Sequence, residues 1–152
     1  MQRVNPGARP SDGEAASTDP PTGERVLVHV TEPIGRDALE RYAAASLDFN
    51  PMHLDDDFAR RAGEPAVIAH GMLTLSIAVE QVLAAFPKRG RAGLVDVRFG
   101  RKLDVDRRIH VWMQVDGWSE QPDARRAHTT ISGEDADGNP YVNGQMDVVF
   151  DR

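Results

Sequence analysis

The sequence predicts a single α+β domain in which a curved antiparallel sheet surrounds one long helix. The first supporting observation is an uninterrupted apolar segment of helical length, residues 71–86, in which only Glu80 and Gln81 are strongly polar. The second is a change to alternating apolar and polar residues after Gly93, which indicates strands. The third is that βαβ repeats, the GxGxxG pattern and the P-loop pattern do not occur, which argues against nucleotide-binding α/β folds.

The amino-acid composition excludes or disfavours several classes of function. The chain has 152 residues, of which 28% are charged, and a formal net charge of −6 makes nucleic acid and anionic lipid unlikely partners. It contains no cysteine, which excludes thiolate nucleophiles and thiolate metal sites, and we expect neither a metal nor a cofactor. No segment approaches the roughly 18 apolar residues of a membrane span, and no signal-peptide pattern is present. We therefore expect a cytoplasmic protein with no membrane partner.

The first 24 residues differ from the rest of the chain. They are rich in proline and glycine, and Val4 is their only strongly apolar residue after the initiator methionine. Such a segment buries too little apolar surface to offset the entropy lost on ordering. The sequence therefore predicts a flexible tail over residues 1–24 and one domain over residues 25–152.

The elements of the first half follow in order. Alternation over residues 26–30 predicts a strand, and apolar spacing of i, i+3, i+4 and i+7 over residues 35–46 predicts an amphipathic helix. Pro51 disfavours helical backbone at Asn50, so a polar loop should follow. Three aspartates, residues 55–57, precede a short helix over residues 58–62 that one of them can cap.

The second half begins with the apolar segment. A helix over residues 71–86 that is apolar nearly all round should be buried on most of its faces. Period-two patterns then predict strands over residues 94–99, 109–115, 128–132 and 141–150, with a turn at residues 137–140. These four strands form the meander that completes the sheet.

Two short segments carry residues suited to catalysis. Asp48 and His53 flank the rigid Asn50-Pro51 pair, and a carboxylate and an imidazole held across a fixed turn can converge on one water. Taken alone, the same residues are weak evidence for catalysis and suit better an Asp48 that caps a helix and a His53 in solvent. The second segment enters the long helix, where Gly71 can present an unpaired N–H to an oxygen. A purely structural interpretation is equally open: Gly71 is then needed only for close packing of the helix, and His70 caps the turn.

Together the two segments resemble a known family. The pattern is Tyr42-Ala43-x-x-Ser46-x-Asp48-x-Asn50-Pro51-x-His53-x-Asp55, followed by Ile68-Ala69-His70-Gly71-Met72-Leu73-Thr74. It closely resembles the MaoC-like family of (R)-specific enoyl-CoA hydratases and (3R)-hydroxyacyl-thioester dehydratases. The resemblance covers about residues 30–100 by motif and the remainder by strand order. It implies a hot-dog fold, in which the sheet wraps the long helix, and a dimer joined edge to edge through the sheets.

The resemblance also implies an activity, namely hydration of trans-2-enoyl thioesters of coenzyme A or acyl-carrier protein, or the reverse dehydration. Asp48 and His53 would act on one catalytic water, and Asn50 would hold the loop. We expect His53 to take the proton from water and Asp48 to deliver one to Cα, with the reverse assignment open. Gly71 would donate its N–H to the thioester carbonyl. Its neighbours His70 and Met72 would position the substrate.

Two alternative functions stay open. Hot-dog thioesterases commonly place a catalytic carboxylate on the central helix, and Glu80 lies in the third turn of that helix. A second alternative is a subunit of a heteromeric dehydratase, in which a partner hot-dog chain supplies the acyl pocket.

The chain also departs from the family pattern. Leu47 stands where relatives usually have Gly, and the two prolines usual after Arg98-Phe99 are missing. From residue 88 to residue 108 there are eight basic and three acidic residues, a balance of 8 − 3 = +5. This stretch could receive the phosphates of coenzyme A or an acidic carrier protein, or it could simply be solvated arginines.

Overall fold

The structure is a computed structural model that describes residues 19–152. Most of the predicted tail, residues 1–18, lies outside the described residues. Contacts with the sheet begin before the predicted boundary at Arg25. Asp19 forms an ion pair with Arg125 at 2.8 Å, and the Gly23 N–H donates to the Val115 carbonyl oxygen at 2.8 Å.

One antiparallel sheet of five strands forms the body of the molecule. Its strands are β1 (Arg25–Val30), β2 (Arg91–Phe99), β3 (His110–Glu120), β4 (Ala124–Glu134) and β5 (Pro140–Asp151). Their order across the sheet is β1-β3-β4-β5-β2, so β1 and β2 are the two edges. All the predicted strands are present, and β3, β4 and β5 extend beyond the apolar alternation because strand pairing continues through charged positions such as Arg125 and Arg126.

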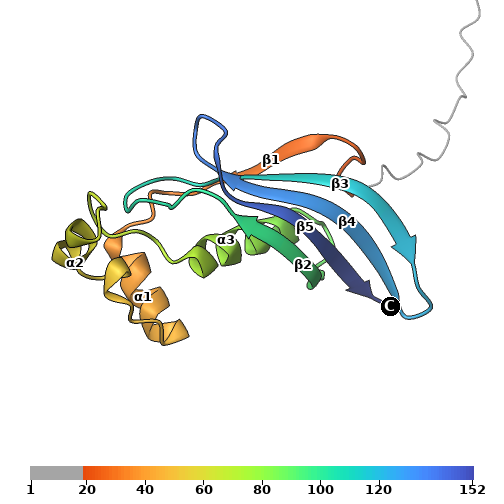
Figure 1. The fold of residues 1–152 in the computed structure, drawn as a ribbon. Coiled ribbons are helices and arrows are strands. Elements are labelled where there is room, and N and C mark those ends of the chain that lie inside the picture. The colour runs from red at the N-terminus through yellow and green to blue at the C-terminus, as the bar shows by residue number, and fades with distance from the viewer. Residues whose placement is uncertain (1–18) are drawn as a thin grey trace, which may run out of the picture.

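Four helical segments accompany the sheet. They are α1 (Arg36–Ser46), the short 3₁₀ helix η1 (Pro51–His53), α2 (Asp56–Arg61) and α3 (Gly71–Ala84). The sheet curves over α3, while α1 and α2 lie together at one end of the molecule (Figure 1). This arrangement confirms the predicted hot-dog fold. No helix in the described part of the chain is long and apolar enough to cross a bilayer.

Local signals in the sequence explain the helix ends. The Asp55 carboxylate accepts hydrogen bonds from the N–H groups of Asp57 at 2.8 Å and Phe58 at 3.0 Å, so the predicted cap of α2 is confirmed. The residue that ends α1, Leu47, has φ 61° and ψ 23°, the left-handed conformation that favours glycine. This backbone geometry explains why a glycine suits the position.

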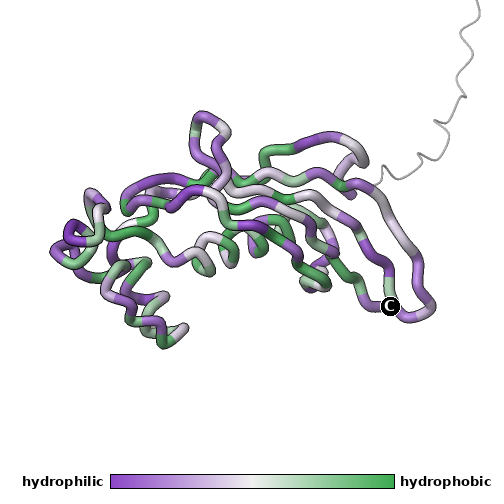
Figure 2. The backbone as a smooth tube through the Cα atoms, in the orientation of Figure 1, coloured by the Kyte–Doolittle hydropathy of each residue, from purple (hydrophilic) through white to green (hydrophobic). Residues whose placement is uncertain are grey.

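The core lies between α3 and the concave face of the sheet. The side chains of Val111, Met113 and Val115 on β3, and of Ile109 just before it, are fully buried, as the alternation predicts. Apolar residues recur along α3 (Figure 2).

The expected burial of α3 on most of its faces is wrong for the single chain. Only Thr74, Ala78 and Val82 of this helix are buried, and they form one stripe facing the sheet. A single curved sheet covers only one side of a helix, which leaves residues such as Met72 53% exposed. Other apolar residues of α3, such as Leu73, Leu75 and Ile77, are only partly buried against the core of the single chain.

Candidate active site

The loop after α1 holds Asp48 through its own hydrogen bonds. The Asp48 N–H donates to Ser46 Oγ at 3.3 Å, and the Asn50 N–H donates to Asp48 Oδ1 at 3.2 Å. The Asn50 side chain accepts from the Met52 N–H at 3.0 Å and so caps η1. Asn50 therefore both orients the Asp48 carboxylate and starts the helical turn that carries His53, a geometry compatible with the loop-holding role expected for it.

His53 is held by the segment that leads into α3. Its Nδ1–H donates to the Ile68 carbonyl oxygen at 2.8 Å, because a carbonyl oxygen can only accept. The Ile68 N–H in turn donates to the Met52 carbonyl oxygen at 3.3 Å, so the two segments are tied together on either side of the ring. With the proton of neutral His53 on Nδ1, its Nε2 carries a free lone pair.

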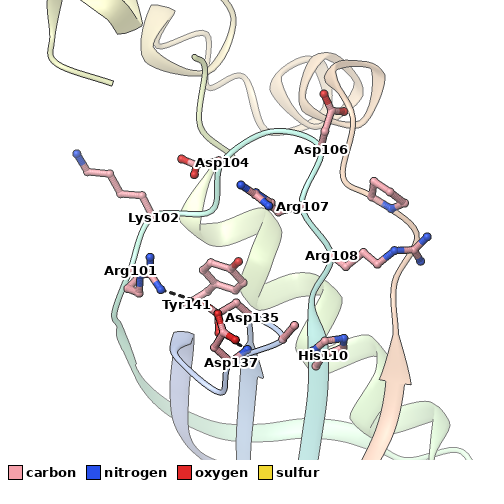
Figure 3. A pocket seen from close by; sticks show the side chains of 12 residues that line it. Arg101, Lys102, Asp104, Asp106, Arg107, Arg108, His110, Asp135, Asp137 and Tyr141 are labelled. Carbon is pink, nitrogen blue, oxygen red and sulfur yellow. Dashed lines mark hydrogen bonds and ion pairs between the residues drawn. The ribbon is translucent and has the colours of Figure 1, made fainter. Parts of the chain in front are cut away.

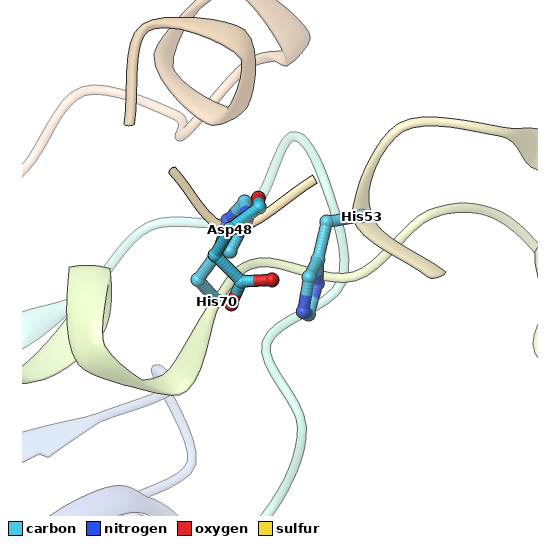
Figure 4. A group of neighbouring side chains, drawn as sticks. All are labelled: Asp48, His53 and His70. Carbon is cyan, nitrogen blue, oxygen red and sulfur yellow. The ribbon is translucent and has the colours of Figure 1, made fainter. Parts of the chain in front are cut away.

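Three side chains from three segments converge at this point. Asp48 comes from the loop after α1, His53 from η1 and His70 from the residue before α3, and a polar atom of each lies within 4.8 Å of the others. The Asp48 carboxylate is directed toward the His53 ring (Figure 4). Residues that are far apart in the sequence thus form one cluster of titratable groups.

His70 supports the other two residues from the buried side. It is 2% exposed, and its ring stacks on that of His53 with centroids 3.9 Å apart. Its Nε2–H donates to the Asp48 carbonyl oxygen at 3.1 Å, while its buried Nδ1 has no partner among the described residues. Burial, aided by the neighbouring His53, lowers the pKa of His70 below its ordinary value of 6.5, which keeps the ring neutral.

The turn-cap alternative for His70 is wrong in one respect. His70 is the N-cap residue of α3, but its side chain makes no capping hydrogen bond and points into the cluster instead. The side chain of His70, which we expected to position the substrate, therefore contacts Asp48 and His53.

The same three residues could in principle offer ligands to a metal ion. However, His53 Nδ1 and His70 Nε2 already donate to carbonyl oxygens. The two rings are also stacked with only 29° between their planes, so their in-plane lone pairs do not converge on one point. The arrangement suits proton transfer better than metal coordination.

Gly71 opens α3 beside this cluster. Its N–H has no acceptor among the described residues, as expected for the first residue of a helix. Together with His53, Thr74, Phe99 and Tyr141 it lines a cavity of about 170 Å³. A Cβ atom on Gly71 would lie 3.3 Å from Phe99 Cε1, so glycine keeps the approach to this N–H open.

Tyr141 was not predicted from the sequence. This residue of β5 is 7% exposed and lines both the small cavity and an adjoining charged pocket of about 470 Å³. Burial raises the pKa of its hydroxyl above 10.0. In the sequence Tyr141 belongs to the period-two pattern of a strand, and no neighbouring motif indicates a functional role.

The charged pocket contains part of the basic stretch. Its lining includes Arg101, Lys102, Arg107 and Arg108, but also Asp104, Asp106, Asp135 and Asp137 (Figure 3). Arg101 is paired with Asp135 at 2.8 Å, and Lys102 is paired with Glu64 outside the pocket. The local excess of positive charge is therefore largely matched by nearby carboxylates.

Two residues singled out in the sequence lie away from the cavity. Met72 is 53% exposed and is not among the residues that line it. Glu80 lies nine residues after Gly71, roughly 13 Å farther along the helix, and lines a separate groove with Leu83 and Phe86. The structure therefore does not bring Glu80 together with Asp48 and His53.

Comparison with known proteins shows the family. The model of the MaoC like domain matches residues 17–136. The chain belongs to the MaoC-like family. One curated relative of this MaoC-like chain, the 3-hydroxyacyl-thioester dehydratase X of Mycobacterium tuberculosis, is 40% identical over 65 residues, which are 43% of this chain and 22% of that protein. The matched segments of this chain span 22% and 37% of the length of this dehydratase and of the plant dehydratase named next.

Other relatives share the fold or part of the sequence. The mitochondrial 3-hydroxyacyl-[acyl-carrier-protein] dehydratase of Arabidopsis thaliana is 37% identical over 61 residues, 40% of this chain and 37% of that protein. The structure of the R-hydratase PhaJ1 from Pseudomonas aeruginosa superposes with a TM-score of 0.72 at 25% identity, covering 84% of this chain and 80% of that one. The (R)-hydratase from A. caviae gives a TM-score of 0.73 at 25% identity, covering 91% and 100%.

Proposed function

We propose that this MaoC-like chain hydrates trans-2-enoyl thioesters to (3R)-hydroxyacyl thioesters and catalyses the reverse dehydration, as a cytoplasmic enzyme that needs no metal or cofactor. The observation that carries the proposal is the free Nε2 lone pair of His53, which the Nδ1–H bond to Ile68 leaves beside the Asp48 carboxylate. Relatives named as hydratases and dehydratases of thioesters support the same chemistry.

Each group has a separate part in the proposed reaction. As the water oxygen attacks Cβ, His53 Nε2 takes a proton from it, and negative charge moves onto the thioester oxygen. The Gly71 N–H at the positive end of α3 stabilises that charge. The Asp48 carboxylate hydrogen-bonds the same water and then receives the proton from the imidazolium, since the two groups lie within 4.8 Å. Asp48 delivers that proton to Cα, which restores the carboxylate and the neutral His53 ring.

His70 acts as a positioning residue in this scheme. It stays neutral, holds the Asp48 backbone through its Nε2–H and supports the face of the His53 ring. A second positive charge in the stack would oppose protonation of His53 during the reaction, so the neutrality of His70 favours His53 as the base.

The proposal extends to a second hot-dog chain as partner, in a homodimer or a heterodimer. Large apolar side chains near the catalytic cluster stay exposed on the single chain: Phe49 is 59% exposed and Met72 53%. Phe49 lies in the catalytic loop itself, so a chain that covers it would also shape the acyl pocket. Gel filtration separates the options, because a homodimer forms from this chain alone, whereas a heterodimer needs the partner to be expressed with it.

The test is hydration of crotonyl-CoA, followed by loss of absorbance of the conjugated thioester. We expect Asp48→Asn and His53→Ala each to lower the rate by about 100-fold or more while the circular dichroism spectrum stays unchanged. His29→Ala is the matched control, since His29 is exposed on β1. Added EDTA should have no effect, and chiral analysis of the product should give the (3R) alcohol. Near wild-type rates in both variants would refute the assignment.

The same preparations test the thioesterase alternative. Release of free thiol from saturated acyl-CoA, lost in Glu80→Gln, would favour hydrolysis at the groove beside Glu80. A series of trans-2-enoyl thioesters of increasing chain length, carried on coenzyme A or on acyl-carrier protein, would show which carrier and which acyl length are used.

A further inference from the structure

A second group of hydrogen-bonded side chains lies on the face of the sheet that points away from α3. The Nδ1 of His128 lies 2.7 Å from Asp147 Oδ1, and its Nε2 lies 2.9 Å from Ser119 Oγ. The three residues come from the neighbouring strands β4, β5 and β3. The hydroxyl contacts the imidazole and the imidazole contacts the carboxylate, which is the order of contacts in a Ser–His–Asp catalytic triad. Such triads are recognised by this geometry and occur in unrelated folds.

A β-bulge places the serine in this group. Val115 pairs with Thr129 but Gly117 pairs with His128, so Asp116 is one extra residue on β3. The extra residue reverses the alternation that buries Val115, and Ser119 therefore emerges on the same outer face as His128. Without the bulge, Ser119 would point toward the core.

The hydrogen bonds fix the roles of the ring atoms. A carboxylate only accepts, so the His128 Nδ1–H donates to Asp147, and in the neutral ring the Nε2 lone pair accepts from the Ser119 hydroxyl. Asp147 faces His128 directly across the β4–β5 pair, and its side chain is only 22% exposed. The base is thus oriented by a third group, which is the structural sign of an activated nucleophile.

Positive charge lies beside the serine. Arg126 pairs directly with Ser119 across β3 and β4, so both side chains emerge on the same face. Among the described residues Arg126 has no ion-pair partner within 4.0 Å. Its guanidinium can stabilise an oxyanion that develops on a carbonyl next to Ser119.

The hollow next to the group limits the substrate. It has a volume of about 410 Å³, and its lining includes Leu94, Asp96 and Asp116 together with His128 and Asp147. Its carboxylates disfavour an anionic acyl group, and a volume of about 410 Å³ lies toward the small end of ligand pockets, which suits a short one.

We propose that Ser119, His128 and Asp147 form a second, hydrolytic site that cleaves esters of short, uncharged acyl groups. Ser119 Oγ attacks the carbonyl carbon while His128 Nε2 takes the hydroxyl proton. The bond to the leaving alcohol then breaks, and His128 protonates that alcohol. A solvent water, deprotonated by His128, next attacks the acyl-serine, which releases the carboxylic acid and regenerates Ser119.

The first test is covalent labelling of the full chain with a fluorophosphonate. Trypsin releases residues 109–125 as one peptide, and Ser119 is the only residue in it that carries a hydroxyl group. Mass spectrometry should find one label per chain, on this peptide, and Ser119→Ala should abolish it. Labelling confined to another peptide would overturn the proposal.

The second test is hydrolysis of p-nitrophenyl acetate. We expect Ser119→Ala to abolish the enzymatic rate, and His128→Gln to lower it by about 100-fold or more. Ser76→Ala removes an exposed hydroxyl that bonds only to its own helix, and it serves as the matched control with an unchanged rate. A rate that is the same in wild type, Ser119→Ala and His128→Gln would show that no such site exists.

Discussion

Leu47 offers a direct test of how the catalytic loop is built. Its φ of 61° and ψ of 23° lie in the left-handed region, which costs a residue with a Cβ atom about 1–2 kcal/mol. The side chain is 78% exposed, so little buried surface is lost when it is removed. Glycine adopts the conformation without strain but loses more backbone entropy on folding, about 0.5–1 kcal/mol. We therefore expect Leu47→Gly to stabilise the fold by about 0.5–1 kcal/mol.

The assay is thermal and urea-induced unfolding followed by circular dichroism. A gain of this size should raise Tm by about 1–4 °C in a domain of this length. Ala44→Gly is the matched control, because Ala44 lies within α1 with ordinary helical backbone, and there glycine should destabilise by about 0.5–1 kcal/mol. Equal destabilisation by both variants would refute the reasoning and would show that the Leu47 side chain contributes packing that the single chain does not reveal.

Two further predictions concern the cluster around His53. Gly71→Ala keeps the backbone N–H but adds a Cβ atom that crowds the approach of the thioester oxygen to it. The rate of crotonyl-CoA hydration should therefore fall, at most by the roughly 10²–10³-fold that complete loss of an oxyanion donor costs, with little change in Tm because the exposed Phe99 ring can move aside. An unchanged rate would remove Gly71 from the mechanism. Because burial lowers the pKa of His70, the unfolded chain binds a proton more readily, so stability should be complete above about pH 6.5 and fall as the pH drops below it. Urea unfolding at pH 7.5 and pH 5.5 should show a smaller difference for His70→Gln than for wild type, and an identical difference would contradict this account.

Much of the fold follows from the sequence because its signals are local. The proline at position 51, the aspartate cap of α2 and the strict alternation along β3 each act within a few residues, and each predicts the element that the structure shows. The pairing of Asp48 with His53 is equally local, because a short turn started by Asn50 joins them.

The prediction that failed, burial of α3 on most of its faces, depends on what packs against the helix. The apolar composition of α3 indicates burial but does not show which surfaces of the single chain provide it, and one sheet covers only the stripe of Thr74, Ala78 and Val82. In the same way, the basic stretch reads as an excess of positive charge until folding brings carboxylates such as Asp135 beside it.

The sequence by itself determined the order of the elements, the loop that presents Asp48 and His53, and the glycine that opens the long helix, because each depends on neighbours along the chain. Only the tertiary structure decided that His70 stacks on His53 and that Tyr141 lines the same cavity. It alone also decided that a bulge turns Ser119 toward His128. These contacts join residues far apart in the sequence, and their geometry is set by strand register and helix packing, which no local pattern encodes.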